Sequence, residues 1–405
     1  MKRRNLGIAA GAAAASVTAI YDLWLWLANY LTDNFHNDFT FYYAAARVGL
    51  HDGWAHLYDL HLQQQQLDAI GSHITVAQLA RFVSPPPLAL LVSVFTAVPY
   101  QAAYWCWSAL LLFALFLAWK VTAPSTGRAR VIFLVAAIGW LPVIYGLQLG
   151  QPAVLAAYGV AACYARLERN QRFEAGIGLG LVVLKPQLAF LVPPALAVAG
   201  RWRAFAGAAI TLGTLAVVSL VLLGPQGISD YLGILRFATT VPENQSQTLA
   251  AWLPNLTVAR TVQVIVSLWT LVLVYRLRHR DPRVWIAVAL TGGLAASPYT
   301  HYDDLTMLGL AIVLYLGAPR PGWTWSYALA LVIAAEGFPV WGAGPVLVGE
   351  LGALVLFSVA ALKHDDGHAQ QHDAERQHDP DLDRDRQHLA VDGQAQTIDH
   401  RGGQA

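Results

Sequence analysis

Charge is scarce in this sequence. Only 13% of its 405 residues are Asp, Glu, Lys or Arg, about half of the roughly 25% that soluble domains carry. Hydrophobic residues make up 56% of the chain and fall in long blocks. This composition excludes an ordinary soluble protein. It predicts an all-α polytopic membrane protein whose partner is the lipid bilayer, with no nucleic-acid partner.

Cysteine is scarcer still. Cys106 and Cys163 are the two cysteines, and both lie inside apolar runs. This placement excludes a disulfide framework and a cysteine metal site, so we expect both to pack between helices. No other residues form a convincing metal site, and we expect neither a metal nor a cofactor.

The few charges are unevenly distributed. From Lys363 onward ten acidic residues stand against five basic ones, which leaves 15 acidic and 21 basic residues for the rest of the chain. Residues 363–405 are rich in His, Asp, Gln and Arg and almost lack apolar residues, which predicts a disordered tail. The basic surplus of the remainder predicts orientation, because Lys and Arg stay on the cytoplasmic side.

The N-terminus gives the direction of the first helix. Lys2, Arg3 and Arg4 precede an apolar run over residues 6–31. We expect an uncleaved anchor that runs outward; a cleavable signal peptide is the alternative, because residues 12–16 are small. Asp22 lies within this run and is a functional candidate as an ionisable residue in a membrane segment, unless it snorkels or pairs with a neighbouring helix.

Basic clusters divide the chain into about twelve spans, with a range of about 10 to 13. They predict one membrane domain over residues 1–362, with external loops at about 32–85, 224–255 and 297–304. In the first loop, residues 61–66 and 78–81 have the spacing of short interfacial helices. Residues 88–98 are apolar but too short to span a bilayer, which indicates a re-entrant or interfacial segment.

The apolar block at residues 175–200 has basic residues beyond both ends. Because one straight helix cannot keep both ends in the cytoplasm, we predict that the block folds back on itself. Lys185, Pro186 and Gln187 form the break in its middle, since proline removes a backbone donor. Lys185 would then be the tip of a hairpin that points to the external side. One long, kinked helix is the alternative.

This topology gathers polar residues at one face of the membrane. They are Asp38, Gln148, Gln151, Lys185, His301 and Asp304. Such a set suits a reaction in which a base deprotonates a hydroxyl while cations stabilise a leaving phosphate. An acidic residue just after a membrane helix can also be a solvated charge or a helix cap.

Several short motifs carry a resemblance to a known family. They are DF at 38–39, YYAA at 42–45, LYD at 57–59, GQP at 150–152, KPQ at 185–187 before RWR at 201–203, and SP at 297–298 leading to DL at 304–305. In order and spacing these motifs resemble glycosyltransferase family 87, a group of polyprenyl-phosphate-sugar-dependent enzymes with the GT-C membrane fold. The resemblance extends over residues 6–362.

The resemblance implies an inverting transfer of a mannosyl, arabinosyl or similar residue. The donor would be a polyprenyl phosphate sugar and the acceptor a hydroxyl of a glycolipid or polysaccharide. Asp38 is implied as the general base, and no metal is implied. We expect Lys185 and His301 to bind the donor phosphate, and Asp304 either to contact substrate or to hold the start of a helix. Further substrate contacts are expected from Tyr42, Tyr43, Gln151 and Gln187.

A transporter or flippase of lipid-linked sugars is the alternative from another class. Internal symmetry is not apparent in the sequence, and the polar residues gather at one face instead of near the midplane, which favours the enzyme. We expect it in a bacterial-type plasma (inner) membrane, with the active site on the periplasmic face and the tail in the cytoplasm.

Overall fold

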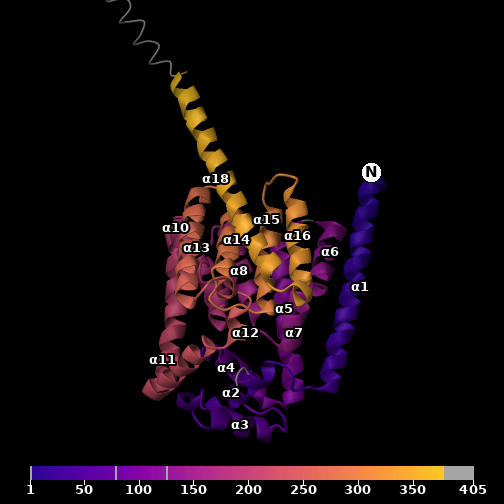
Figure 1. Ribbon diagram of the computed structural model, residues 1–405, viewed down its shortest axis with the longest axis vertical. Coiled ribbons are helices and arrows are strands. Elements are labelled where there is room, and N and C mark those ends of the chain that lie inside the picture. Colours follow the sequence, from indigo (N-terminus) through magenta and orange to yellow (C-terminus); the bar gives the residue numbers. More distant parts are fainter. Residues whose placement is uncertain (1, 78–79, 125, 378–405) are drawn as a thin grey trace, which may run out of the picture. The chain divides into compact units, whose positions relative to one another are not determined.

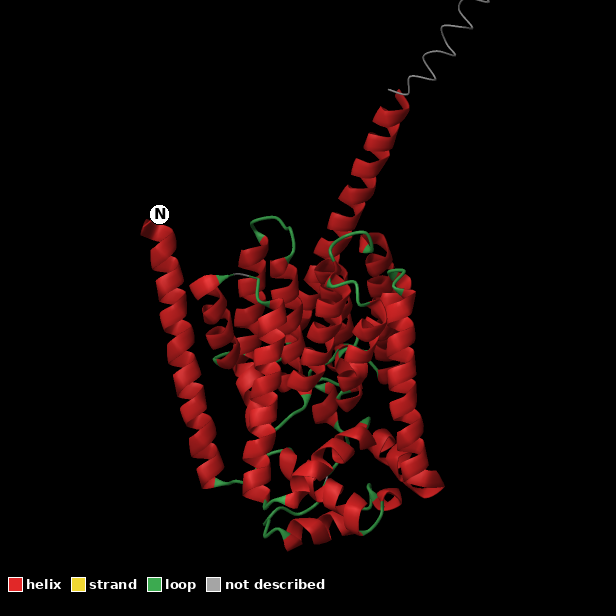
Figure 2. Cartoon of the chain, turned by 180° about the vertical axis from the view of Figure 1, so that it is seen from behind, coloured by secondary structure: helices red, strands yellow, loops and turns green. Residues whose placement is uncertain are grey.

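The computed structural model describes residues 2–77, 80–124 and 126–377. Within these ranges the regular structure is helical, and strand-like pairing is limited to an isolated bridge between Ala77 and Ala80 (Figure 2). The prediction of an all-α protein is confirmed. The chain divides into two compact units, Met1–Val355 and Leu356–Ala405, and the candidate site lies in the first.

Five of the described helices are long and apolar enough to cross a membrane. Their candidate spans are Gly11–Thr32 in α1 (Lys2–Thr32), Tyr100–Thr122 (α5), Trp202–Ala238 (α11), Leu256–Leu277 (α13) and Gly344–Leu362 in α18 (Gly344–Gln377). A sixth candidate is the apolar pair α6 (Gly127–Ile138) and α7 (Leu141–Leu149), which is bent by 54°. These lengths are consistent with a membrane protein.

Shorter helices lie between these candidate spans. They are α8 (Ala153–Glu168), α14 (Pro282–Ala295), α15 (Thr306–Gly317) and α16 (Thr324–Glu336), and α16 leads into α17 (Phe338–Trp341). Each has fewer than the about 20 residues that a span needs. Helix length therefore does not confirm the expected number of spans, and both the count of about twelve and the GT-C fold stay predictions.

The block at 175–200 is broken where the sequence predicted. It comprises α9 (Arg172–Gly178), η3 (Leu179–Leu184), η4 (Pro186–Leu188) and α10 (Val192–Val198). Gly176 packs so closely on α11 that a Cβ atom there would lie 2.0 Å from the carbonyl oxygen of Ala204. The segment thus starts beside the first turn of α11 and returns to it at Trp202, so it folds back with Lys185 at the turn.

The first expected external loop is mostly helical. It contains α2 (Phe39–His51), η1 (Trp54–His56) and α3 (Leu60–Ala69), and is followed by α4 (Pro86–Ser93) and η2 (Val94–Ala97). These elements gather at the end of the first unit opposite the N-terminal end of α1 (Figure 1). Because α2 is rich in aromatic and small residues, it is buried along most of its length.

The two interfacial helices expected in this loop have different outcomes. Residues 61–66 lie in α3, as predicted. The expected helix at 78–81 is wrong at its last two residues, because Ala80 pairs with Ala77 and Arg81 lies in a bend. Residues 78–79 lie outside the described ranges.

The loop expected at 224–255 begins at a kink in α11. Gly224 has φ 60° and ψ −175°, and Pro225 follows it, so the helical ladder is interrupted at the residue where the span was predicted to end. The helix resumes to Ala238, and α12 (Pro242–Gln245) and η5 (Leu249–Trp252) follow. Tyr231 stacks on Tyr58 with ring centroids 4.8 Å apart, which ties this segment to the first external one.

In the second unit, α18 continues to Gln377. Residues 363–377 therefore have a helical backbone where disorder was expected, which is consistent with the helix propensity of their Ala, Gln and Glu residues. The rest of the expected tail, 378–405, lies outside the described residues.

The close approach of α9 to α11 predicts a steric effect. Gly176→Ala should destabilise the protein by about 1–3 kcal/mol, because backbone atoms of α11 leave no room for a methyl group. Gly213→Ala is the matched control, since a Cβ atom at Gly213 in α11 meets nothing within 4 Å. Thermal unfolding in detergent measures both; equal Tm values for the two variants would contradict this packing.

Candidate active site

Asp38 immediately precedes α2. Its N–H donates to the carbonyl of Leu149 over 3.0 Å. Although it occupies the N-cap position, its side chain makes no capping hydrogen bond. The Gln151 amide instead donates to Oδ2 of Asp38. The carboxylate is half-buried. Because it does not accept a hydrogen bond from the N–H groups of α2, it remains available to a substrate.

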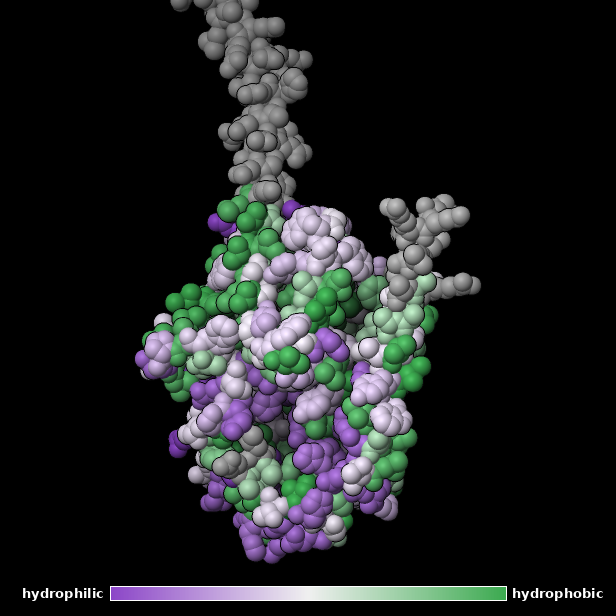
Figure 3. Space-filling model, turned by 45° about the vertical axis from the view of Figure 1, so that its right-hand side comes forward, coloured by the Kyte–Doolittle hydropathy of each residue, from purple (hydrophilic) through white to green (hydrophobic). Residues whose placement is uncertain are grey.

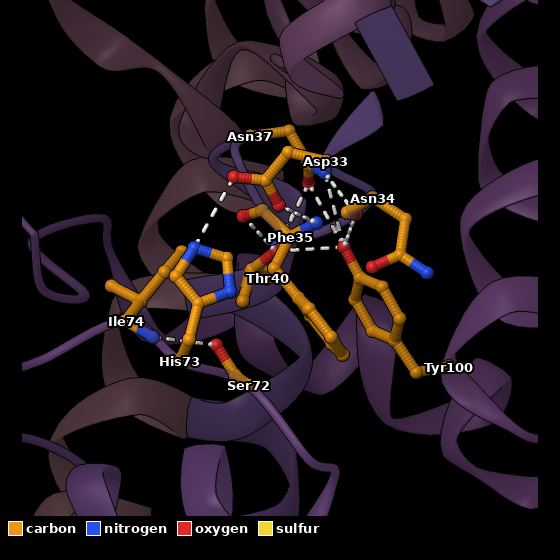
Figure 4. A network of polar contacts seen from close by, with 9 residues as sticks. All are labelled: Asp33, Asn34, Phe35, Asn37, Thr40, Ser72, His73, Ile74 and Tyr100. Atoms are coloured by element: carbon orange, nitrogen blue, oxygen red, sulfur yellow. Dashed lines mark hydrogen bonds and ion pairs between the residues drawn. The ribbon is translucent and has the colours of Figure 1, made fainter. Parts of the chain in front are cut away.

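A hydrogen-bond network fixes the chain just before Asp38 (Figure 4). The Tyr100 hydroxyl and the Asn37 amide each donate to the carbonyl of Asn34 over 2.8 Å. The Thr40 hydroxyl donates to the carbonyl of Phe35, also over 2.8 Å. Buried polar groups that are satisfied in this way hold a single backbone conformation. The network therefore positions Asp38 rigidly at the start of α2.

Gly150 places Gln151 beside Asp38. It ends α7 in a left-handed conformation, with φ 72°, and a Cβ atom there would lie 2.8 Å from Cβ of Phe39. The Trp107 indole donates to the Gly150 carbonyl over 2.8 Å. Only glycine fits this tight turn without strain.

Lys185 is buried at the turn of the α9–α10 hairpin. Its ammonium group lies 2.5 Å from Oδ2 of Asp303 and also pairs with Oδ1 of Asp304. Both carboxylates belong to η6 (Tyr302–Leu305) and are almost completely buried. Buried charges are tolerated when they are paired and hydrogen-bonded. This ion cluster therefore joins the hairpin to the segment that follows α14.

His301 lies at the start of η6. The backbone N–H of His301 donates to Oδ2 of Asp304 over 2.8 Å. Asp304 therefore caps this short helix in addition to pairing with Lys185. The ring Nε2 lies 3.1 Å from Oδ1 of Asn244. The imidazole also packs on Tyr299, with ring centroids 4.7 Å apart. These contacts bring the segment after α11 to the site.

The pKa of the Asp38 carboxyl is raised. Burial is the main cause and the Asp303 carboxylate adds to it, while Lys185, His301 and the Gln151 hydrogen bond act in the opposite direction. Burial also lowers the pKa of His301, only partly offset by Asp303. His301 is therefore neutral at pH 7 and acts as a hydrogen-bonding group. This differs from the cationic role that the sequence suggested.

Burial lowers the pKa of Lys185, but Asp303 and Asp304 outweigh it and the net pKa is raised. The ammonium group is thus charged throughout the physiological range. Burial raises the pKa of Asp304, with Asp303 adding and Lys185 opposing. One ammonium group shared by two carboxylates leaves this cluster with an excess of acidic groups.

The remaining predicted substrate contacts differ in position. Tyr42 lies one helical turn after Asp38, and burial, followed by the Asp38 carboxylate, raises its pKa. The Tyr43 hydroxyl points elsewhere and donates to the carbonyl of Val98 over 2.8 Å. Gln187 is half-buried beside the exposed Pro186 at the hairpin turn. The structure thus brings Tyr42 to Asp38 but not Tyr43.

Two other acidic candidates lie away from this cluster. The Asp59 carboxylate caps α3, accepting from the N–H groups of His61 at 2.8 Å and Leu62 at 3.1 Å. Asp22 is buried in α1, and its electrostatic neighbours are Glu336 and Tyr302. Neither joins the set around Asp38 and Lys185.

Sequence reasoning missed Asp303 and Asn244 as site residues. Asp303 accepts a hydrogen bond of 2.5 Å from the Lys185 ammonium group, yet only its neighbour Asp304 was selected. The adjacent pair of acidic residues was the available signal. Asn244 lies in the expected second external loop and had no local signal, because its contact with His301 depends on how α11 and α12 fold.

Asp38 immediately precedes α2, which lies in the lower half of the first unit (Figure 1). Figure 3 shows hydrophilic residues around a hollow in the lower half of the molecule, the half that holds α2, α3 and α4 in Figure 1. Among the described residues, no group of three or more His, Cys, Asp or Glu side chains is arranged to hold a metal ion. The chemistry available to the site is that of a carboxylate base, a buried ammonium group, and amide and imidazole hydrogen-bonding groups.

These features define a helical membrane protein with a polar, acid-rich site near one end of its helices. The chain belongs to glycosyltransferase family 87, whose sequence model matches residues 82–298, more than half of the chain. The matched region contains Gln151 and Lys185, whereas Asp38 and His301 lie outside it. No curated protein and no solved structure matches the chain.

The ion cluster predicts a stability effect that depends on pH. Lys185→Met should destabilise the protein by about 3–5 kcal/mol, because it leaves two buried carboxylates without their counter-ion. The raised pKa of Lys185 keeps its ammonium group charged throughout pH 5–8. In the variant the carboxylates must take up protons to remain buried. The deficit should therefore be larger at pH 8 than at pH 5.

Lys120→Met is the control for this experiment, since Lys120 is exposed at the end of α5 and should tolerate the change at both pH values. Thermal unfolding of the three proteins at pH 5 and pH 8 provides the measurement. A Lys185→Met deficit that does not change with pH would show that the carboxylates do not depend on this ammonium group.

Proposed function

We propose that this glycosyltransferase moves a sugar from a polyprenyl phosphate carrier to a hydroxyl of a glycolipid or polysaccharide acceptor. The proposal rests on the Asp38 carboxylate. This group makes no capping hydrogen bond and accepts a hydrogen bond from Gln151. Asp303, Lys185 and His301 act on it electrostatically. The family supports sugar transfer; the donor, the acceptor and the stereochemistry are part of the proposal.

In the proposed reaction Asp38 is the general base. It takes the proton from the acceptor hydroxyl as the hydroxyl oxygen attacks the anomeric carbon of the donor sugar. The bond from that carbon to the phosphate oxygen breaks on the opposite face, so the configuration inverts and the polyprenyl phosphate leaves with the bonding electrons. A raised pKa makes Asp38 a stronger base than an ordinary carboxylate.

Lys185 and His301 are assigned to the donor phosphate. An ammonium group has three N–H donors, and two of those of Lys185 are directed to Asp303 and Asp304. The third is available for a phosphate oxygen. Neutral His301 would contribute a hydrogen bond, with its orientation set by Asn244. The two acidic partners of Lys185 also favour release of the anionic product after transfer.

We place the active site on the periplasmic face of a bacterial-type plasma membrane. The support is the basic N-terminus, which lies at the end of α1 remote from α2, α3 and α4 (Figure 1). The lipid tail of the donor would lie in the bilayer beside the helices, with its phosphate at the level of the site.

Substitution of Asp38 tests the proposal. Asp38→Asn keeps the shape and removes the base, so transfer should fall by about 10²- to 10⁴-fold. The measurement is transfer from radiolabelled polyprenyl-phosphate mannose or arabinose to a membrane lipid extract by purified protein in nanodiscs. Undiminished transfer in the variant would move the base elsewhere. Sugar-lipid flux across the membrane without transfer would instead indicate a transporter.

Asp59→Asn is the matched control, because Asp59 belongs to the same segment but caps α3. It should retain transfer at a stability cost of at most about 1 kcal/mol. Equal loss of transfer in both variants would point to misfolding of the segment and not to removal of a base.

The pH profile provides a separate prediction. Because the base must be ionised, the transfer rate should rise with pH through the pKa of Asp38 and then level off. Burial raises that pKa, so the midpoint should lie above the value of about 3.9 for a free Asp side chain. Single-turnover rates between pH 4 and 8 measure this; a midpoint at or below about 4 would contradict the buried setting of the base.

A further inference from the structure

A second cleft lies on the α1 side of Asp38. It has a volume of about 310 Å³ and is formed by the end of α1, the segment that follows it, α5 and α7. This volume lies at the lower end of the range of about 300–1,000 Å³ usual for small-molecule sites. Neither Lys185 nor His301 lines it, so it is distinct from the place assigned to the donor phosphate.

Two segments that line the cleft are also next to the proposed base in the chain or in space. Asn37 and Gln148 line the cleft, and the residues that follow them in the chain, Asp38 and Leu149, are joined by a hydrogen bond of 3.0 Å. The cleft therefore lies beside the backbone of Asp38. The α9–α10 hairpin packs against α11 at Gly176, and α10 and α11 lie on the opposite side of the unit from α1 (Figure 1).

One polar group of the cleft is buried without a partner. Asn29 and His36 are exposed and Gln148 is half-buried, whereas the hydroxyl of Tyr30 is buried and has no hydrogen-bond partner. A buried hydroxyl without a partner is costly. Together these groups offer amide, imidazole and phenol donors and acceptors around one space.

Ring contacts and polar contacts hold side chains in the walls of the cleft. The Tyr30 ring stacks on Tyr104 with centroids 4.5 Å apart and meets Trp105 edge-on at 4.8 Å. Asp33 is held by His73 at 3.2 Å and by the N–H of Phe35 at 3.0 Å (Figure 4). Pre-organised polar groups lower the entropic cost of binding.

The charge of the lining selects the class of ligand. Among the described residues that line the cleft, there is a carboxylate, Asp33, but no Lys or Arg. A phosphate group is therefore disfavoured, whereas a neutral, polyhydroxylated group matches amides, a carboxylate and aromatic hydroxyls.

We infer that this cleft binds the neutral sugar portion of the acceptor and presents its hydroxyl to Asp38, an inference that rests on the proposed function. Donor and acceptor then approach Asp38 from opposite sides, the donor phosphate from the Lys185 side and the acceptor sugar from the α1 side. In-line displacement with inversion requires such an arrangement, because the attacking oxygen and the leaving phosphate lie on opposite faces of the anomeric carbon.

Filling the cleft tests the inference. Asn29→Trp places a large side chain in it from the exposed face of α1, and should raise the acceptor KM about tenfold or more. Slow hydrolysis of the polyprenyl-phosphate sugar in the absence of acceptor should be unchanged. Leu31→Trp is the matched control, because Leu31 is on the same helix, is 75% exposed and does not line the cleft. Gln148→Leu removes only an amide and should raise the acceptor KM about 2- to 10-fold.

A binding measurement separates this inference from the proposed function. Saturation-transfer NMR with neutral mannose and arabinose oligosaccharides should detect binding to wild type, Asp38→Asn and Leu31→Trp, and a loss in Asn29→Trp. Binding with this pattern but without turnover of any polyprenyl-phosphate sugar would overturn the proposed function and keep the glycan site. No binding to wild type, equal binding to both tryptophan variants, or a fall in donor hydrolysis in Asn29→Trp would overturn the site.

Discussion

The ion cluster of Lys185, Asp303 and Asp304 is the interaction on which the site depends. In an apolar chain with few charges, three ionised groups can be buried together only if they are paired. Their pairing joins the turn of the α9–α10 hairpin to η6, two segments more than 100 residues apart in sequence. Because η6 carries His301 and the hairpin leaves regular helical geometry at Lys185, the same contact also stabilises irregular backbone inside the helical unit.

The position of Asp38 depends on a different kind of constraint. Hydrogen bonds from Asn37, Thr40 and Tyr100 hold the chain before it, and the turn at Gly150 brings Gln151 to its carboxylate. The two halves of the site are thus anchored independently, one by ion pairs and the other by neutral hydrogen bonds. A base whose pKa is raised by burial can then operate close to an ammonium group without pairing with it, since Lys185 pairs with Asp303 and Asp304 instead.

Sequence reasoning worked where a local signal existed. The long apolar run at residues 6–31 predicted α1, and the proline after Lys185 predicted the break in the hairpin. Sequence reasoning failed for helices that are stabilised by packing against other segments. The helix α2 was not foreseen because its residues are buried on every face, which removes the polar alternation that marks an amphipathic helix. The helical stretch after Gly224 was taken for a loop, because glycine and proline interrupt a helix but do not prevent it from resuming.

By itself, the sequence determined the membrane class of the chain, its approximate apolar segments and the residue types available for chemistry, because hydrophobicity and charge act on each segment separately. Only the tertiary structure decided which of these residues meet. Asp59 and Asp38 look alike in sequence, yet one caps a helix and the other does not. Lys185 was expected to bind the donor phosphate and is shared by two carboxylates in the structure. Tyr42 and Tyr43 also point to different partners. The physical reason is that burial and pairing depend on contacts between distant segments, which no local pattern contains.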